Sequence, residues 1–411
     1  MMKIGIIREG KIPPDKRVAL LPHQCIEVMK LFPQIEVYVQ PSPVRCVTDN
    51  EYEAAGVAVT ENLSHCDILF GIKEVPVSQL IDNKIYFFFS HTVKKQKYNR
   101  HLLQTILKKN ITLVDYECLT NNVTTRQRII AFGKYAGIVG AYNAFWTYGK
   151  KYKIYDIKRA YACYNMAEMK EEYKKICLPP IKIAITGSGR VGKGVQEVLQ
   201  DLMFAKVTPQ AFLNEAFNAP VYTVLQSEDY HQHKDGLAWN SLDFHQNPQN
   251  YFSLFAPFTK QADILITSAF WHPKAPRLFY EADMKQPEFR IRVISDISCD
   301  VDGSVPCTVK TTTINDPVYD YDPATGQVMA PFSSPNAITV MAIDNLPCEL
   351  PYDASAYFGQ QLINNVLPLL IYSDKEAVIE RATITRYGKL MPDYQYLEDF
   401  VKEYPDETLF K

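Results

Sequence analysis

The stretch KIAITGSGRVGKGVQEVLQDL, residues 182–202, decides the fold class of this chain. Its first five residues form an apolar run that predicts a buried strand, and the apolar residues Val195, Val198 and Leu199 then recur at helical spacing. Between strand and helix stands a G-x-G-x-x-G turn, Gly187-Ser188-Gly189-Arg190-Val191-Gly192. A glycine turn in this position is typical of Rossmann folds, in which a parallel sheet binds a dinucleotide.

The three glycines of this turn have separate tasks. The first permits the tight turn, the second lets the backbone approach a pyrophosphate, and the third lets the helix pack closely on the strand. The unpaired N–H groups and the dipole at the helix N-terminus favour a bound anion. We therefore expect residues 187–192 to bind NAD(P). A purely structural glycine turn is the alternative.

The choice between NAD and NADP depends on residues near the adenosine ribose. The acidic residue that usually follows about 20 positions later and accepts the 2′-hydroxyl is missing from FAKVTPQAF, residues 204–212. The next predicted strand, VYTVL, is followed by Glu228 and Asp229. If this loop borders the ribose, its carboxylates repel a 2′-phosphate and favour NAD. The equally good alternative is that Glu228 and Asp229 belong to a solvated loop without a part in cofactor binding.

Roughly the first 120 residues also alternate strand and helix signals. Short apolar runs mark the strands at residues 3–7, 35–39, 67–72, 85–90 and 111–116. This alternation predicts a mostly parallel sheet with helices on both faces. We therefore expect an α/β protein with two Rossmann-like, doubly wound domains. The first is a discontinuous substrate and catalytic domain, residues 1–128 plus 345–411, and the second a dinucleotide-binding domain, residues 129–344.

Composition and charge argue against several classes of protein. Lys and Arg number 44 against 46 Asp and Glu, a net charge of −2 with no basic block, which argues against nucleic acid as a partner. No apolar run reaches the about 18–20 residues that cross a bilayer, and the start lacks a signal-peptide pattern. The nine cysteines form no C-x-x-C pair and no zinc-ligand spacing. We expect a cytoplasmic protein with reduced cysteines, no metal and no membrane contact.

Ionisable residues directly follow three of the predicted N-terminal strands. Lys73 and Glu74 follow DILFGI, His91 follows IYFFFS, and Glu117 follows ITLVDY. The carboxyl ends of parallel strands meet at one edge of a sheet, where ligands bind. A partly buried lysine and a histidine both transfer protons near neutral pH, and a nearby carboxylate orients them. We expect Lys73 and His91 to be catalytic with Glu117, although each taken singly also has a structural explanation.

Two arginines suit the binding of substrate carboxylates, because a guanidinium donates two parallel hydrogen bonds. They are Arg128 and Arg17, the latter in a loop that also carries Arg8, Glu9 and Lys16.

The second domain has comparable positions at its strand ends. Ser268 follows DILIT, Asp296 lies near the end of RVISDIS, and Asp344 and Leu346 lie in a turn before the C-terminal helix. We expect these residues to contact the ribose or the nicotinamide. Asp344 is equally well explained as a turn or helix-capping residue.

Small residues recur at three- and four-residue spacing along a predicted helix from Ile129 to about Tyr148. They predict close packing against a neighbouring helix, and they make this helix the candidate contact of a homo-oligomer.

Several stretches together resemble one known superfamily, that of alanine dehydrogenase and transhydrogenase. Within it the chain is most similar to the lysine–ketoglutarate reductase portion of aminoadipic semialdehyde synthase and to lysine-forming saccharopine dehydrogenases. The matching stretches are DKRVALLP (15–22), GIKEVP (71–76), FFFSHTVKKQ (87–96), LVDYE (113–117), RIIAFGKYAGIVG (128–140), TGSGRVGKG (186–194), ISDISCDVDGSV (294–305), TTTINDPVYDYD (311–322) and MAIDNLPCELPYDAS (341–355).

The resemblance implies an active site in the cleft between two domains and a reversible reaction of L-lysine, 2-oxoglutarate and NAD(P)H to saccharopine. Carried over by motif, Lys73 and His91 are the acid–base pair, and Glu74 and Glu117 tune them. Arg17, Arg128 and Glu74 are expected to bind substrate. The resemblance covers one catalytic module, so we expect a single reductase step. The acidic residues Glu228 and Asp229, which follow VYTVL, favour NAD over NADP as the cofactor.

Two other functions stay open at this point. An enzyme like alanine dehydrogenase would use ammonia and a small keto acid, but the segment DNLPCELP (344–351) favours saccharopine chemistry. A non-catalytic nucleotide sensor is the second, and the intact set of Lys73, His91 and Glu117 argues against it.

Overall fold

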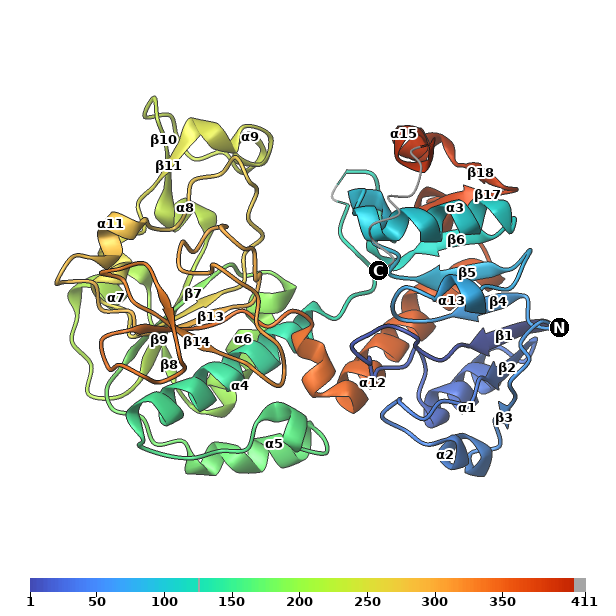
Figure 1. Cartoon of the computed structure of the whole chain (residues 1–411), viewed down its shortest axis with the longest axis horizontal. Helices are drawn as coiled ribbons and strands as arrows, with labels where there is room; N and C mark the ends of the chain where they lie inside the picture. The colour runs from blue at the N-terminus through green and yellow to red at the C-terminus, as the bar shows by residue number, and fades with distance from the viewer. Residues whose placement is uncertain (125, 403–411) are drawn as a thin grey trace. The chain divides into compact units, whose positions relative to one another are not determined.

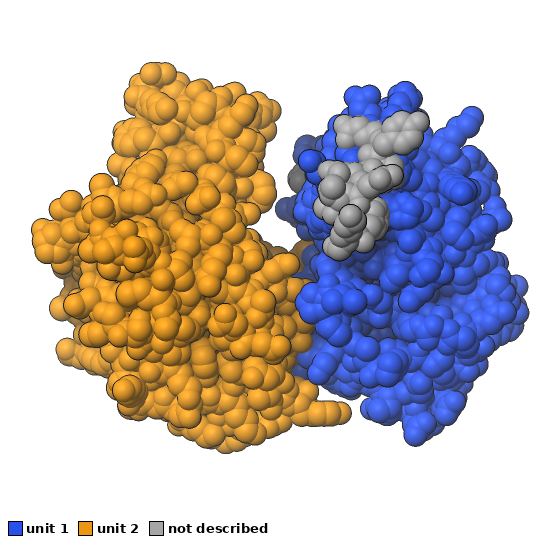
Figure 2. Space-filling model, viewed as in Figure 1, with its two compact units in different colours: residues 1–132, 351–411 blue, residues 133–350 orange. Residues whose placement is uncertain are grey.

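The computed structural model describes residues 1–124 and 126–402, and the chain folds into two compact units (Figure 2). Unit 1 comprises residues 1–132 and 351–411, and unit 2 residues 133–350. Each contains one mostly parallel sheet of eight strands, so the predicted α/β class is confirmed. The chain passes between units at residues 133 and 351 rather than 129 and 345, because the helix that opens unit 2 begins at Gly133.

The sheet of unit 1 has the strand order β18-β17-β6-β5-β4-β1-β2-β3 (Figure 1). Strands β1 to β6 run parallel, and β17 and β18 add an antiparallel edge from the C-terminal part of the chain. Their bounds are β1 Met2–Ile6, β2 Ile35–Val39, β3 Ala58–Val59, β4 Ile68–Phe70, β5 Ile85–Phe88, β6 Thr112–Asp115, β17 Thr383–Arg386 and β18 Lys389–Leu390.

The helices of unit 1 come from both ends of the sequence. Proline suits the first position of a helix, and α1 begins at Pro22. Helix α12 packs on α1 so closely that a Cβ on Gly359 would lie 2.1 Å from the Gln24 side chain. The helices are α1 Pro22–Leu31, α2 Asp49–Ala54, α3 Arg100–Lys108, α12 Pro351–Gln361, α13 Leu367–Ile371, α14 Val378–Ala382 and α15 Glu398–Lys402.

The sheet of unit 2 has the order β15-β14-β16-β13-β12-β7-β9-β8. It is parallel from β16 to β8, and β14 and β15 form an antiparallel edge. The bounds are β7 Lys182–Thr186, β8 Ala205–Lys206, β9 Val221–Leu225, β12 Ile264–Thr267, β13 Val293–Asp296, β14 Tyr319–Tyr321, β15 Val328–Met329 and β16 Ile338–Met341.

The small-residue helix, α4 (Gly133–Tyr152), packs inside unit 2 against α6 (Arg190–Asp201). A Cβ on Gly137 would lie 2.0 Å from the Val191 carbonyl oxygen, and a Cβ on Gly194 would lie 2.0 Å from that of Lys134. The predicted close packing is therefore confirmed. The glycines of this stripe are covered within the unit, and the use of this helix as a contact between copies stays a prediction.

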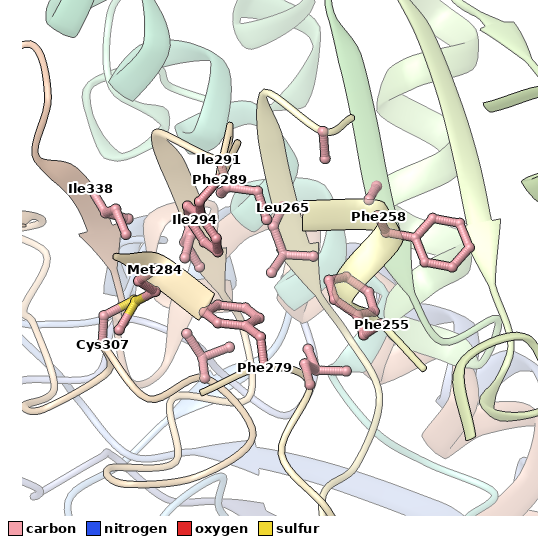
Figure 3. Close-up of a cluster of buried hydrophobic side chains, with 14 of the residues drawn as sticks. Phe255, Phe258, Leu265, Phe279, Met284, Phe289, Ile291, Ile294, Cys307 and Ile338 are labelled. Atoms are coloured by element: carbon pink, nitrogen blue, oxygen red, sulfur yellow. The ribbon is translucent and has the colours of Figure 1, made fainter. Parts of the chain in front are cut away.

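A cluster of buried aromatic and aliphatic side chains covers the other face of the same sheet (Figure 3). Successive residues of a strand point to opposite faces. Accordingly Ile294 joins this cluster, while the Ser295 hydroxyl donates to the Gly140 carbonyl oxygen of α4 at 3.0 Å. Phe255, Phe258 and Phe279 form the aromatic centre of the cluster, so both faces of the sheet are buried.

The polar stretch after β9 is an ordered excursion rather than a bare loop. It contains α8 (Ser227–Tyr230), β10 (His231–His233), α9 (Ser241–Gln246), β11 (Tyr251–Ser253) and α10 (Ala256–Thr259). Strands β10 and β11 form a separate antiparallel pair. None of the helices that the structure describes is long and apolar enough to span a bilayer.

Candidate active site

The carboxyl ends of β4, β5 and β6 bring the predicted acid–base residues of unit 1 to one edge. These strands are neighbours and parallel, so the residues that follow them emerge on the same side of the sheet. Buried Asp115, the last residue of β6, fastens two of these ends together. Its carboxylate accepts from the backbone N–H of Ser90 at 2.9 Å and from that of Glu117 at 2.7 Å. The position of His91 is thereby tied to that of Glu117.

His91 forms a close pair with Glu74. Its Nδ1 lies 2.6 Å from Glu74 Oε1, and the imidazole stacks on Phe89. The backbone of His91 is left-handed, at φ 52°, a conformation that costs a non-glycine residue on the order of 1–3 kcal/mol. Burial alone would raise the pKa of Glu74, but the hydrogen bond and charge of His91, with Lys11, outweigh burial and lower it to about 2. A Glu74 carboxylate held on Nδ1–H leaves Nε2 for proton transfer.

Lys73 is placed by its backbone as well as by its strand. The backbone N–H groups of Ile72 and Lys73 donate to the two oxygens of Glu9, at 2.6 and 2.8 Å. Burial, followed by the charges of Arg17 and Lys11, lowers the pKa of Lys73. Within residues 1–124 and 126–402, its ammonium has no hydrogen-bond or ion-pair partner. A half-buried amine with a lowered pKa suits proton transfer near neutrality.

Arg17 is fixed by its own chain. Its guanidinium is 2% exposed, with Nε 3.0 Å and Nη2 2.6 Å from the Asp15 carboxylate. The guanidinium also lies over the ring of Phe132, with Arg17 Cζ 4.1 Å from the ring centroid. The sequence analysis gave no role to Asp15 or Glu9. The signal available was only that both stand in the loop after β1, next to residues already selected.

Glu117 pairs with cations rather than with Lys73. Its Oε1 lies 2.8 Å from Arg128 Nη2 and 3.0 Å from Lys94 Nζ. Burial alone would raise the pKa of Glu117, but the charges of Arg128 and Lys94 outweigh it and lower the pKa. Arg128 is exposed, so its guanidinium is anchored by Glu117 while facing solvent. Lys94 was missed by the sequence analysis, because nothing in the local pattern marks it.

The glycine turn of unit 2 has the geometry that pyrophosphate binding needs. Gly187 has φ 90°, and a Cβ there would lie 2.9 Å from the Ala269 nitrogen. A Cβ on Gly192 would lie 2.1 Å from the Gly187 carbonyl oxygen. Around Gly189, by contrast, a Cβ would meet no described atom within 4 Å. The backbone at the N-terminus of α6 is therefore open to a ligand, and the residues present fit a dinucleotide.

Of the other residues expected near the nucleotide, Ser268 and Leu346 contact neighbouring parts of unit 2, and Asp344 is exposed to solvent. The Ser268 hydroxyl donates to the carbonyl oxygens of Thr186 at 2.6 Å and Gly187 at 3.2 Å, so it braces the turn. Leu346 is buried and packs near Gly140. Asp344 is exposed at the turn after β16.

Asp296, which was predicted to contact the nucleotide, is buried within unit 2. It is 1% exposed, and its carboxylate accepts from Thr267, Ser298, Thr308 and the Cys299 backbone. Three of these bonds go to Oδ1 and one to Oδ2, and direct contact between Asp296 and a nucleotide stays a prediction. Leu346 is likewise buried, and its contact with a nucleotide also stays a prediction. Whether a residue at a strand end points outward depends on the pleat and on the loops around it, which the sequence does not reveal.

The loop after β9 lies beside the glycine turn. The Ser188 hydroxyl donates to Gln226 Oε1 at 3.3 Å. Asp229 caps the start of α8 by accepting from the Gln226 backbone at 2.7 Å, whereas Glu228 is exposed. Of the two carboxylates expected near the ribose, Glu228 is therefore the one not engaged in capping.

A cavity of about 190 Å³ adjoins this turn in unit 2. Thr186 and Ala269 line it at the turn, and the excursion after β9 contributes His231 and Phe244. Burial lowers the pKa of His231 to about 4, so its ring is neutral at physiological pH. With Trp271 on the wall as well, the cavity presents flat, uncharged rings. No local sequence pattern predicts this cavity, because its walls come from segments that are far apart in the chain.

No group of three or more His, Cys, Asp or Glu side chains in the described part of the chain is arranged to hold a metal ion. All nine cysteines are free thiols.

Comparisons with known proteins agree with the resemblance that the motifs indicated. Residues 5–139 match the family model of the alanine dehydrogenase/PNT N-terminal domain. The chain is 29% identical over 447 residues to alpha-aminoadipic semialdehyde synthase, mitochondrial, of Mus musculus, covering 96% of this chain and 47% of that protein. It is 25% identical over 381 residues to saccharopine dehydrogenase [NAD(+), L-lysine-forming] of Neurospora crassa, covering 86% and 88%.

A solved L-alanine dehydrogenase superimposes with a TM-score of 0.62 at 16% identity, covering 97% of this chain and all of that one. A transhydrogenase from Sinorhizobium meliloti gives 0.56, also at 16% identity, covering 95% and 99%. These structures confirm the fold. The chain spans about half the length of the semialdehyde synthases that it matches.

Proposed function

We propose that this chain is an NAD(P)-dependent oxidoreductase that interconverts saccharopine with L-lysine and 2-oxoglutarate. The observation that carries the proposal is the His91–Glu74 pair beside half-buried Lys73, at one sheet edge of unit 1. A second sheet in the same chain has a glycine turn open to a pyrophosphate. Similarity to lysine-forming saccharopine dehydrogenases over most of the chain supports the choice of substrates.

The residues of unit 1 perform the proton transfers of this reaction. The ε-amine of lysine adds to the keto carbon of 2-oxoglutarate, and loss of water leaves an imine. His91 Nε2 and Lys73 Nζ exchange the protons that these steps require, while Glu74 keeps the imidazole oriented. Arg17 and Arg128 bind substrate carboxylates, and Glu117 anchors Arg128. When bound, the nicotinamide supplies or accepts the hydride that interconverts the imine and the secondary amine.

The residues of unit 2 hold the cofactor. Residues 187–192 bind the pyrophosphate, and Ser268 braces that turn. The cavity of neutral rings that includes His231 and Trp271 takes the adenine. Exposed Glu228 binds the ribose 2′-hydroxyl and disfavours NADP. Unit 1 carries the acid–base groups and unit 2 the nucleotide turn, so the proposed reaction requires both units.

Absorbance of the reduced nicotinamide, followed with L-lysine and 2-oxoglutarate, tests the function directly. NADH and NADPH are run in parallel, and pyruvate with ammonia is the control reaction. We expect turnover with lysine and a preference for NADH. Nucleotide binding without turnover on any amine would refute the enzyme, and turnover only with pyruvate and ammonia would refute the substrates.

A Lys73→Met variant separates proton transfer from binding. We expect turnover to fall roughly 10²–10⁴-fold, because a general acid–base group contributes about that much. A near-normal rate would remove Lys73 from this role.

A further inference from the structure

A second cavity, of about 400 Å³, opens beside Glu74 in unit 1. It is formed by the loop after β1, the loop after β4 and the start of α3. The lining residues that matter are Lys11, Glu74, Asn99 and Tyr98. In the acid–base chemistry proposed above, Lys11 acts only through its charge on Lys73 and Glu74, and Asn99 has no part, so the cavity needs an explanation of its own.

Asn99 lines this cavity and has a buried, unsatisfied side-chain amide. Its side chain is 3% exposed, and within the described residues its Nδ2 has no hydrogen-bond partner. Asparagine in this position normally caps the following helix. Here a 3-10 turn precedes α3, the Asn99 backbone has φ −93° and ψ 0°, and the side chain makes no capping bond. Leaving a buried donor unpaired is costly, so a ligand that accepts from this amide gains affinity.

Glu74 connects the cavity to the acid–base residues through its two oxygens. Oε1 is held by His91 at 2.6 Å. Oε2 lies 3.2 Å from Lys11 Nζ, but no group in the described chain donates a hydrogen bond to it. One carboxylate therefore faces the imidazole with one oxygen and a cavity cation with the other.

The charges of the cavity select for a particular kind of ligand. A simple anion is attracted by Lys11 but repelled by Glu74. A simple cation is attracted by Glu74 but repelled by Lys11. A ligand with an ammonium next to a carboxylate satisfies both. Its ammonium donates to Glu74 Oε2, and its carboxylate accepts from Lys11 and from the Asn99 amide. The first turn of α3 contains no acidic residue that would oppose this carboxylate.

We propose that this cavity binds the α-amino and α-carboxylate groups of the amine substrate. Lys11 and Asn99 are then specificity residues that select an α-amino acid over a simple amine. This inference rests on the proposed function, since it names the subsite for the head group of lysine.

The test compares L-lysine with cadaverine, which has the same distal amine but no carboxylate. In the full-length Asn99→Asp variant the new carboxylate repels that of lysine and attracts the ammonium of cadaverine. We expect the ratio of kcat/KM for lysine to that for cadaverine to fall at least roughly tenfold. Lys11→Met should lower the same ratio, mainly through KM for lysine. Lys16→Met, an exposed lysine of the same loop, is the matched control and should leave it unchanged.

Calorimetric titration of L-lysine into the same proteins gives a readout that is independent of turnover. We expect Asn99→Asp and Lys11→Met to weaken lysine binding and Lys16→Met to leave it intact. If the wild type converts lysine but neither variant changes the ratio or the binding, the subsite is refuted and the function stands. If lysine binds through these residues without turnover, the function is refuted and the subsite stands. Absence of lysine binding to the wild type refutes the subsite.

Discussion

Arg159 and Glu349 form a buried ion pair in unit 2 whose disruption has a calculable effect. Glu349 is fully buried, and its carboxylate accepts from Arg159 at 2.7 Å, from Asn143 at 2.8 Å and from the Tyr161 backbone at 3.3 Å. The Arg159 guanidinium also lies 4.8 Å from the ring centroid of Trp146. Glu349 belongs to DNLPCELP, so this pair gives that segment a structural role.

Arg159→Met leaves a buried carboxylate without its counter-charge. Removing one partner of a buried pair costs about 3–5 kcal/mol. The donors on Asn143 and Tyr161 remain, so we expect the lower end, a loss of about 3 kcal/mol in the free energy of unfolding of unit 2.

The loss should depend on pH in a defined direction. Burial already raises the pKa of Glu349, with Arg159 as the largest opposing influence, so Arg159→Met raises it further. A carboxyl whose folded pKa is raised is stabilised as the neutral form at low pH, and the penalty grows as pH rises through the unfolded pKa toward the folded one. The variant should therefore lose less stability at about pH 5 than at about pH 8.

Tryptophan fluorescence during urea unfolding measures this effect selectively. Trp146, Trp239 and Trp271 are the three tryptophans of the chain, and all lie in unit 2. Adding Glu349→Gln to Arg159→Met should restore part of the stability and abolish the pH dependence. Equal losses at both pH values, or a variant within about 1 kcal/mol of the wild type, would refute the reasoning.

Three further predictions concern other parts of the chain. Gly194→Ala should destabilise unit 2 by at least about 1–3 kcal/mol in the same fluorescence assay, because its Cβ would lie 2.0 Å from a backbone oxygen of α4. Gly236→Ala is the milder comparison, since a Cβ there meets no described atom within 4 Å, although its φ of 72° adds strain. Glu74→Gln should lower the free energy of unfolding above about pH 4.5. Because the folded pKa of Glu74 is lowered, the difference from the wild type should vanish as pH falls toward 2. Calorimetric unfolding across this pH range measures the difference. NADH should quench Trp271 fluorescence in the wild type and less in Gly189→Val, whose side chain fills the open space at the turn; equal quenching would contradict the assigned pyrophosphate site.

The edge that carries Lys73, His91 and Glu117 was predictable because each residue directly follows an apolar run. Parallel strands bring such positions together without further information. The partners within the edge were not predictable. Two features determine which side chains contact one another. One is the left-handed backbone of His91, and the other is the hydrogen bond that Glu9 accepts from the loop after β4, a segment distant in sequence.

By itself, the sequence determined the α/β class, the strands and the glycine turn, because apolar periodicity and the conformational freedom of glycine act within a few residues. It also supplied the small-residue stripe, in which Gly137 lies too close to α6 to admit a Cβ. Only the tertiary structure decided that Asp296 points inward and that Asn99 and Glu74 share a cavity. Those outcomes depend on contacts between segments far apart in the chain, where burial and hydrogen bonding, rather than local preference, select the orientation of a side chain.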